Sequence, residues 1–125
     1  MNELIPYDSN DTPIECLYQW DISQGITFKN TTLIYGANSV PWIHFSGKLC
    51  QTAYVVSPTV GALDASNMAN LTAMVPAALL ENADTISVYL YEKNNVTGGG
   101  YRTTAKTKIP VVPRSKPENY ESLTE

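Results

Sequence analysis

Few side chains in this sequence are of the types that carry out chemistry, and they are scattered. His44 is the single histidine, and it is the first candidate for a general acid or base because an unperturbed imidazole titrates near neutrality. No nearby serine, cysteine or carboxylate forms a recognisable dyad with it. The sequence also contains no G-x-S-x-G nucleophile elbow. We therefore interpret His44 as part of an aromatic-lined strand surface, and we expect no catalytic residue and no enzymatic activity.

Metal ligands are equally sparse. The two cysteines, Cys16 and Cys50, have no CxxC spacing, and a single histidine cannot complete a zinc site with them. The aspartates of the predicted loops are spaced unlike those of an EF-hand: Asp8, Asp11, Asp64 and Asp84. We expect no metal and no cofactor. The two thiols are predicted to be reduced and buried, as small hydrophobic side chains.

The remaining polar motifs favour structure over catalysis. The stretch NNVTGGGYR leads into a predicted strand, whereas a phosphate-binding loop leads into a helix, so we interpret it as a hairpin tip. Within predicted strands the acidic residues are chiefly Glu15, Asp21 and Glu92, all near strand ends. This distribution does not favour the paired carboxylates of a glycoside hydrolase.

Composition limits the class of protein. A chain of 125 residues, 43% of them hydrophobic, has the size of one domain with one core. Its net charge of -4 and pI of about 4.9 argue against nucleic acid and anionic membranes as partners. Its apolar runs are too short to cross a bilayer, and MNELIPYDSNDTP at the N-terminus lacks the pattern of an export signal.

Short runs of β-branched and aromatic residues, separated by Gly, Pro and polar residues, dominate the sequence and predict strands. They recur about once in a dozen residues, which is the spacing of an antiparallel sandwich or barrel. The predicted strands are Glu15–Asp21, Ile26–Phe28, Thr32–Tyr35, Trp42–Ser46, Ala53–Ser57, Asn70–Met74, Thr85–Tyr91 and Arg102–Val112.

Alternation within two of these runs assigns their faces. In TISVYLYEK, Ile86, Val88 and Leu90 share one face of a strand, and the residues between them share the other. In WIHFSG, Ile43 and Phe45 are predicted to point inward and their neighbours outward. A helical periodicity would scatter both sets around a cylinder, so strands are favoured.

One helical turn is predicted over Pro76–Asn82, because proline at a first helical position precedes Ala and Leu pairs. The predicted fold class is therefore all-β. We expect an antiparallel β-sandwich of about seven or eight strands, immunoglobulin-like, with one short helical turn.

The C-terminal stretch IPVVPRSKPENY begins as an apolar strand and is then broken by prolines. Pro110 and Pro113 cannot donate backbone hydrogen bonds, so the strand is predicted to leave its sheet, and RSKP favours an extended conformation. We therefore expect two parts, a β-sandwich domain over residues 1–112 and an extended C-terminal docking arm over residues 113–125.

The predicted arm carries residues suited to binding. Arg114 can offer a bidentate fork to a carboxylate, and Tyr120 can serve as a rigid aromatic contact in an interface. A solvated tail is the alternative interpretation, in which case the attachment surface would be the aromatic face around Trp20 and Trp42. The predicted partner-binding residues are Arg114, Lys116, Pro117, Tyr120, Trp20 and Trp42.

Four stretches in order, YQWDISQGITF, WIHFSG, VPAALLENADTISVYLYE and IPVVPRSKPENY, resemble small virion proteins from phages of Gram-positive and gut bacteria. The middle stretch is also similar to the N-terminal domain of phage upper baseplate proteins. Related chains often continue past the final tyrosine into a coiled coil or fibre, whereas this one stops at Glu125. The residues that carry the resemblance are Gln19, Trp20, Asp21, Pro76, Leu79, Leu80, Val88, Tyr89, Pro110, Val111, Arg114, Lys116, Pro117 and Tyr120.

This resemblance implies a virion protein that is assembled in the host cytoplasm and acts by protein–protein binding in a capsid fibre, tail fibre or baseplate. Its expected partners are other capsid, tail or baseplate proteins, and it is expected to form a homo-oligomer, for example a trimer. The alternative function is a carbohydrate-binding module. Its stacking platform would consist of Trp20, Trp42, Tyr89, Tyr91 and Tyr101.

Overall fold

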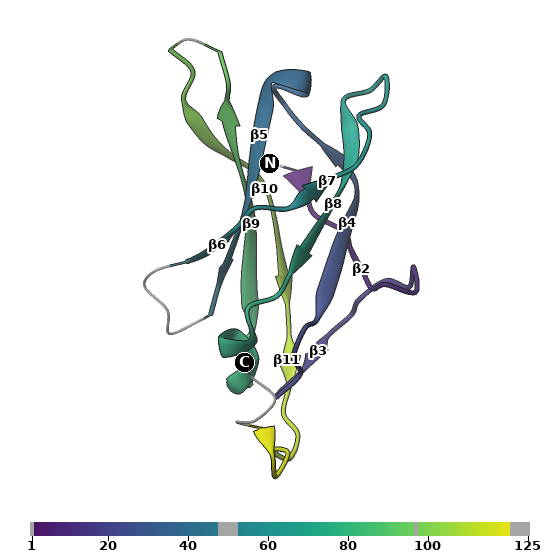
Figure 1. The fold of residues 1–125 in the computed structure, drawn as a ribbon, viewed down its shortest axis with the longest axis vertical. Helices are drawn as coiled ribbons and strands as arrows, with labels where there is room; N and C mark the ends of the chain where they lie inside the picture. Colours follow the sequence, from purple (N-terminus) through teal and green to yellow (C-terminus); the bar gives the residue numbers. More distant parts are fainter. Residues whose placement is uncertain (1, 48–52, 97, 121–125) are drawn as a thin grey trace.

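The computed structural model describes residues 2–47, 53–96 and 98–120, and nearly all of its regular structure is β-strand (Figure 1). Its strands are β1 (Asn2–Glu3), β2 (Pro6–Tyr7), β3 (Leu17–Tyr18), β4 (Gly25–Thr32), β5 (Ser39–Ser46), β6 (Tyr54–Val56), β7 (Thr59–Val60), β8 (Met68–Met74), β9 (Ile86–Asn94), β10 (Tyr101–Ile109) and β11 (Val111–Val112). Two short 3-10 turns accompany them, η1 (Gly36–Asn38) and η2 (Ala77–Glu81).

The strands form two main sheets, and the predicted all-β sandwich is confirmed. One sheet has five strands in the order β1-β10-β9-β5-β6, and the other has four in the order β2-β4-β8-β7. Strands β11 and β3 form a small separate pair. The order β2-β4-β8-β7 corresponds to strands A, B, E and D of an immunoglobulin domain, and β10-β9-β5 corresponds to G, F and C. The layout is therefore immunoglobulin-like, as the strand spacing predicted.

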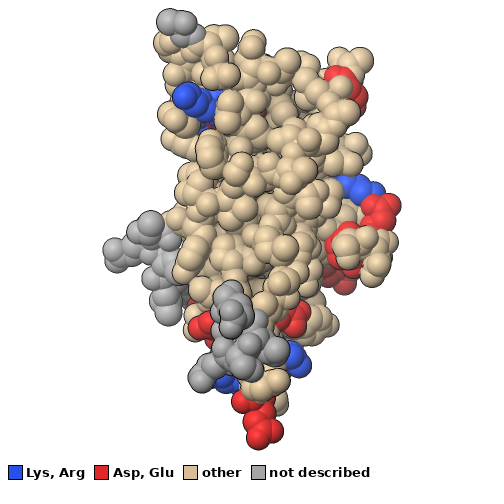
Figure 2. Space-filling model, in the orientation of Figure 1, with Lys and Arg blue, Asp and Glu red and all other residues tan. Residues whose placement is uncertain are grey.

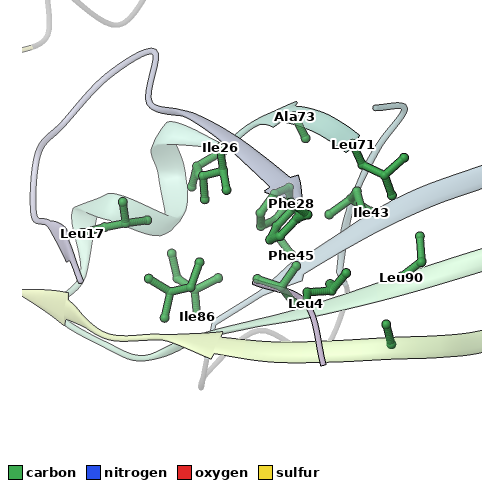
Figure 3. Close-up of a cluster of buried hydrophobic side chains, with 14 of the residues drawn as sticks. Leu4, Leu17, Ile26, Phe28, Ile43, Phe45, Leu71, Ala73, Ile86 and Leu90 are labelled. Carbon is green, nitrogen blue, oxygen red and sulfur yellow. The ribbon is translucent and has the colours of Figure 1, made fainter. Parts of the chain in front are cut away.

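The core lies between the two sheets (Figure 3). Phe28 and Leu71 come from the four-stranded sheet, while Ile43, Phe45 and Leu90 come from the five-stranded sheet, and all five are fully buried. Each such side chain contributes about 1.5–3 kcal/mol relative to an exposed position. The inward faces assigned from alternation in β5 and β9 are confirmed.

Apolar packing takes the place of the inter-sheet disulfide that joins strands B and F in antibody domains. The corresponding strands here, β4 and β9, contain no cysteine. Cys16 carries a free thiol and is half-buried, which corrects the prediction that it is fully buried. It lies beside the short strand β3 at the end of the sandwich, outside the apolar core. Cys50, the other predicted thiol, lies outside the described residues.

The predicted strand Thr32–Tyr35 is wrong, because β4 runs on through the polar KN pair and ends at Thr32. Asn30 adopts a left-handed backbone conformation with φ 51° and inserts a bulge between Phe28 and Thr31. The side chain of Asn70 accepts the Asn30 N–H at 3.0 Å. A polar pair that resembled a turn in the sequence is therefore a bulge within one strand.

Strands β1, β2 and β7 were not predicted, because two residues are too few to show alternation. The predicted sheet was antiparallel, but two of the short pairs are parallel: β1 lies beside β10, and β3 lies beside β11. The helical turn expected over Pro76–Asn82 is confirmed as η2, a 3-10 helix with Pro76 at its N-cap. No helix in the described part of the chain is long and apolar enough to cross a membrane.

Candidate functional site

A buried carboxyl group is the most isolated polar feature of the sandwich. Glu92 on β9 is 0% exposed, and its Oε1 accepts the Ile34 N–H at 2.9 Å and the Ser39 hydroxyl at 2.6 Å. Its Oε2 accepts the hydroxyl of Thr104. Each of these hydrogen bonds joins β9 to another segment, so Glu92 links parts of the sandwich from a fully buried position.

The sequence offered one signal for this link that was missed. Glu92 continues the inward alternation of Ile86, Val88 and Leu90, so its side chain had to point into the sandwich. From its place in the sequence, Glu92 was predicted only to lie near a strand end. Among the residues that the structure describes, no group of three or more His, Cys, Asp or Glu side chains could hold a metal ion.

A groove of about 550 Å³ lies beside the loop that follows β2 and includes Asp8, Glu15 and Asp21 in its lining. Asp8 is committed to that loop, since its Oδ1 accepts the backbone N–H groups of Asn10 and Thr12. The arrangement is an Asx-type turn. The glycine-rich stretch after β9 forms the predicted hairpin tip, with Gly98 at φ 77°.

The outer side of the five-stranded sheet carries a row of stacked rings. His44 on β5 lies 4.8 Å from the ring centroid of Tyr91 on β9, with an interplanar angle of 34°. Tyr91 in turn stacks on Tyr101 of β10 at 5.2 Å and 14°. Because β5 and β10 flank β9 on opposite sides, His44 and Tyr101 cover the two faces of the Tyr91 ring. Burial lowers the pKa of His44 below its ordinary value.

Two further aromatic side chains share this surface. Trp42 is the cross-strand partner of Tyr91, and Tyr89 is the partner of His44. We call the set Trp42, His44, Tyr89, Tyr91 and Tyr101 the aromatic face. Tyr101 is 53% exposed and Tyr89 is 37% exposed. Lys93 lies at the rim, with its Nζ 5.7 Å from the Tyr101 ring centroid.

Trp20 belongs to a different surface, at the end of the sandwich near η2. Its backbone N–H donates to the carbonyl of Leu80 at 2.7 Å, and its indole Nε1–H donates to the carbonyl of Arg114 at 2.9 Å. Its backbone has φ 74°, a rare conformation for a bulky residue. The structure therefore separates Trp20 from Trp42, and it brings only four of the five predicted platform residues together.

Residues 113–120 fold back onto the sandwich, which corrects the expectation of an extended docking arm. Arg114 Nε donates to the backbone carbonyl of Gln19 at 3.0 Å, so its guanidinium is engaged within the chain. Lys116 Nζ lies 5.3 Å from the ring of Trp20. Pro117 is half-buried and begins a turn whose last residue is Tyr120. Residues 121–125 of the predicted arm lie outside the described residues.

Tyr120 completes this contact and is only 4% exposed. Its ring meets Trp20 edge-on, with centroids 5.2 Å apart and planes at 73°, and its hydroxyl donates to Glu81 Oε2 at 3.1 Å. Burial, together with the nearby Glu81, raises the pKa of Tyr120. The residue predicted as an exposed binding contact is instead packed within its own chain, because the two rings exclude water from each other.

No protein family, no curated protein and no solved structure matches this chain.

Proposed function

We propose that this protein is a non-catalytic structural component of a bacteriophage virion and that it attaches to other virion proteins through its aromatic face. The proposed place in the particle is a capsid fibre, a tail fibre or a baseplate. One structural observation supports this attachment surface: aromatic rings of β5, β9 and β10 lie together on one side of an immunoglobulin-like sheet, and Tyr89 and Tyr101 among them are exposed. The virion assignment rests on the resemblance of the QWD and IPVVPRSKPENY motifs.

The aromatic face has the properties of a protein-binding surface. Tyrosine and tryptophan supply large contact areas and lose little conformational entropy, which is why they dominate interface energetics. Here the stacking of Tyr91 between His44 and Tyr101 fixes the rings before any partner arrives. A rigid surface loses less entropy on binding than a mobile one does.

The carbohydrate-binding alternative fits this geometry less well. A sugar ring stacks on the open face of an aromatic ring, but both faces of Tyr91 are covered by its neighbours. Trp20, the fifth residue of that platform, interacts with Arg114 and Tyr120 at another surface. We therefore expect no binding on a glycan array. Specific retention of one saccharide, lost in Tyr101→Ser, would favour the alternative.

The virion proposal is tested on particles of the phage that encodes the chain. Particles purified by density gradient should contain the protein at a fixed ratio to the major capsid protein, as measured by quantitative mass spectrometry. A protein that is abundant in infected-cell extract but missing from intact particles would overturn the virion assignment.

The attachment surface is tested separately with matched variants. The double variant Tyr89→Ser/Tyr101→Ser should remain folded by circular dichroism, since both side chains are exposed, and its incorporation into particles should fall at least about tenfold. Met74→Ser is the control, because Met74 is 51% exposed on the outer side of the other sheet. Equal incorporation of both variants would place the attachment surface elsewhere.

A further inference from the structure

Strand β6 forms one edge of the five-stranded sheet. Tyr54–Val56 pairs on its inner side with Ile43–Phe45 of β5. On its outer side no strand of the described chain pairs with it. An edge strand presents a row of unpaired backbone N–H and C=O groups, which is a template for pairing with another extended chain.

The two long sides of the sandwich differ in how well they are protected against pairing with a strand of another molecule. On the side of β1 and β2, Glu3 is exposed, Lys106 is exposed on the neighbouring β10, and Pro6 lies within β2. Charges and proline on an edge are the usual features that prevent strands from pairing between molecules. That side is therefore protected against association.

The side of β6 and β7 carries no such charges, and its proline, Pro58, lies between the two strands and not within either of them. The segment 53–60 contains no Asp, Glu, Lys or Arg, and it exposes Tyr54 (42%), Val55 (56%) and Val60 (43%). The chain passes from β6 to β7 across the front of Figure 1, and Figure 2 shows a broad surface without charged side chains in the middle of that view. An uncharged edge with exposed apolar side chains is a predicted association surface.

We propose that β6 pairs antiparallel with β6 of a second copy of this chain, so that two five-stranded sheets join across a two-fold axis. A second copy is the fitting occupant because a two-fold pair places identical segments opposite each other, and an uncharged segment meets itself without repulsion. At the opposite edge of this sheet the outer strand is β1, and the same operation there would bring the exposed Glu3 toward its own copy.

A contact of this kind also limits the assembly to two copies. An isologous pair uses the only outer edge of β6, so the assembly is a dimer and not a filament. Val55, His44 and Tyr89 are successive cross-strand partners in the five-stranded sheet. Joining two sheets at β6 therefore makes the aromatic faces of the two copies continuous. The inference concerns the β6 edge alone, and it stands whether or not the chain is a virion protein.

The test is a charge swap at Val55. In a pair centred on Val55, the two copies of this residue lie directly opposite, so Val55→Lys and Val55→Glu each bring like charges together. We expect the wild-type chain to be a dimer at roughly 100 μM by analytical ultracentrifugation, and each variant alone to weaken dimerisation at least about tenfold. An equimolar mixture of the two variants should recover a heterodimer, because opposite charges then face each other.

Each of three results would overturn the proposal: a monomeric wild-type chain, a Val55→Lys variant that dimerises as well as the wild type, or a mixture that stays monomeric. Val96→Lys is the matched control, since Val96 is 47% exposed at the β9–β10 hairpin, and this variant should remain a dimer. Amide hydrogen exchange gives a second readout. Those amides of Tyr54–Val56 that point away from β5 should be protected in the wild type and lose protection in Val55→Lys, while the β9 amides stay protected in both.

Discussion

Among the residues that the structure describes, Glu92 is the one acidic or basic side chain that is fully buried. Its three donors come from the segment after β4, from β5 and from β10. A carboxyl group can accept all three at once, whereas an apolar residue would leave three donors without partners. Glu92 is therefore held in the core by the donors around it.

This arrangement predicts the order of two substitutions. Glu92→Ala removes every acceptor and leaves a cavity, so we expect it to lower the free energy of unfolding by about 3 kcal/mol. Glu92→Gln keeps the shape and can accept from Ile34 and Ser39 while its amide donates to Thr104, so we expect a loss of about 1 kcal/mol. Urea unfolding measures both. Equal losses would contradict this order, because they would show that neither the shape nor the acceptors retained by Glu92→Gln contribute to stability.

His44 makes stability depend on pH near neutrality. Burial lowers the pKa of the folded imidazole below its ordinary value near 6.5, so the unfolded chain binds the proton first as the pH falls. The contribution is complete above about pH 6.5 and is lost as the pH drops from there toward the folded pKa. We expect urea midpoints measured from about pH 7.5 to about pH 5.5 to decline more for the wild type than for His44→Gln.

The same group can be observed directly. The chain has a single histidine, so one imidazole resonance reports its titration by NMR. A titration midpoint at or above 6.5 would contradict the effect of burial. So would parallel stability curves for the wild type and His44→Gln.

At the residue scale, the sequence could predict which side chains of β5 and β9 point inward, since alternation alone decides it. It could not predict the contacts of Glu92 or Tyr120. Those contacts join residues 58 and 39 positions apart, to Ile34 and Glu81 respectively, and no local pattern encodes such pairs. Tyr120 in particular lies in a polar stretch, which gave no sign of burial.

The packed C-terminal segment, residues 113–120, should contribute measurably to the free energy of unfolding. Tyr120→Ala removes a buried ring and its edge-on contact with Trp20, and we expect it to lower the free energy of unfolding by about 3 kcal/mol. Tyr120→Phe removes only the hydrogen bond to Glu81 and should cost about 1 kcal/mol.

Tyr18→Ala is the control for this series, because Tyr18 is 48% exposed and substitutions at such sites change stability by about 0.5 kcal/mol or less. Chemical denaturation followed by tryptophan fluorescence suits the measurement, since Trp20 is the direct neighbour of Tyr120. If Tyr120→Ala is as mild as Tyr18→Ala, the segment does not stabilise the sandwich.

The bulge in β4 gives a second prediction for an element. Asn30 has φ 51°, which glycine adopts freely and β-branched residues adopt only with strain. Asn30→Gly should therefore leave stability within about 0.5 kcal/mol of the wild type, and Asn30→Val should cost about 1–3 kcal/mol. Thr27→Val in the regular part of the same strand controls for side-chain type. Thermal melts that rank Val above Gly at position 30 would contradict the strain.

At this scale the sequence predicts long strands and misses short ones. The segments that became β5, β8, β9 and β10 show alternation over enough residues to be recognised. Strands of two residues, such as β1 and β2, exist only because a neighbouring strand offers them backbone partners. The bulge was misread for a related reason, since the conformation of Asn30 depends on its hydrogen bond to Asn70 in another strand.

At the scale of the whole molecule, the spacing of the strands was sufficient to predict a sandwich with an immunoglobulin-like layout. The surfaces were harder to assign. Trp20 and Trp42 are both aromatic and both lie within predicted strands, yet they lie on separate surfaces because residues 113–120 return to cover Trp20. The path of those residues depends on tertiary contacts that the sequence does not reveal.

The two parallel strand pairs, β1 with β10 and β3 with β11, have a consequence for folding during synthesis on the ribosome. Strands β1 and β3 are synthesised well before β10 and β11, the strands with which they pair. While residues 101–112 are still inside the ribosome, β1 and β3 of the nascent chain therefore lack their partner strands. Contacts between residues so distant in sequence also form slowly. We expect ribosome-bound chains stalled with those residues still in the exit tunnel to be digested by protease, and chains with all residues released to resist it. Resistance in the shorter chains would mean that the sandwich can close before its last strands exist.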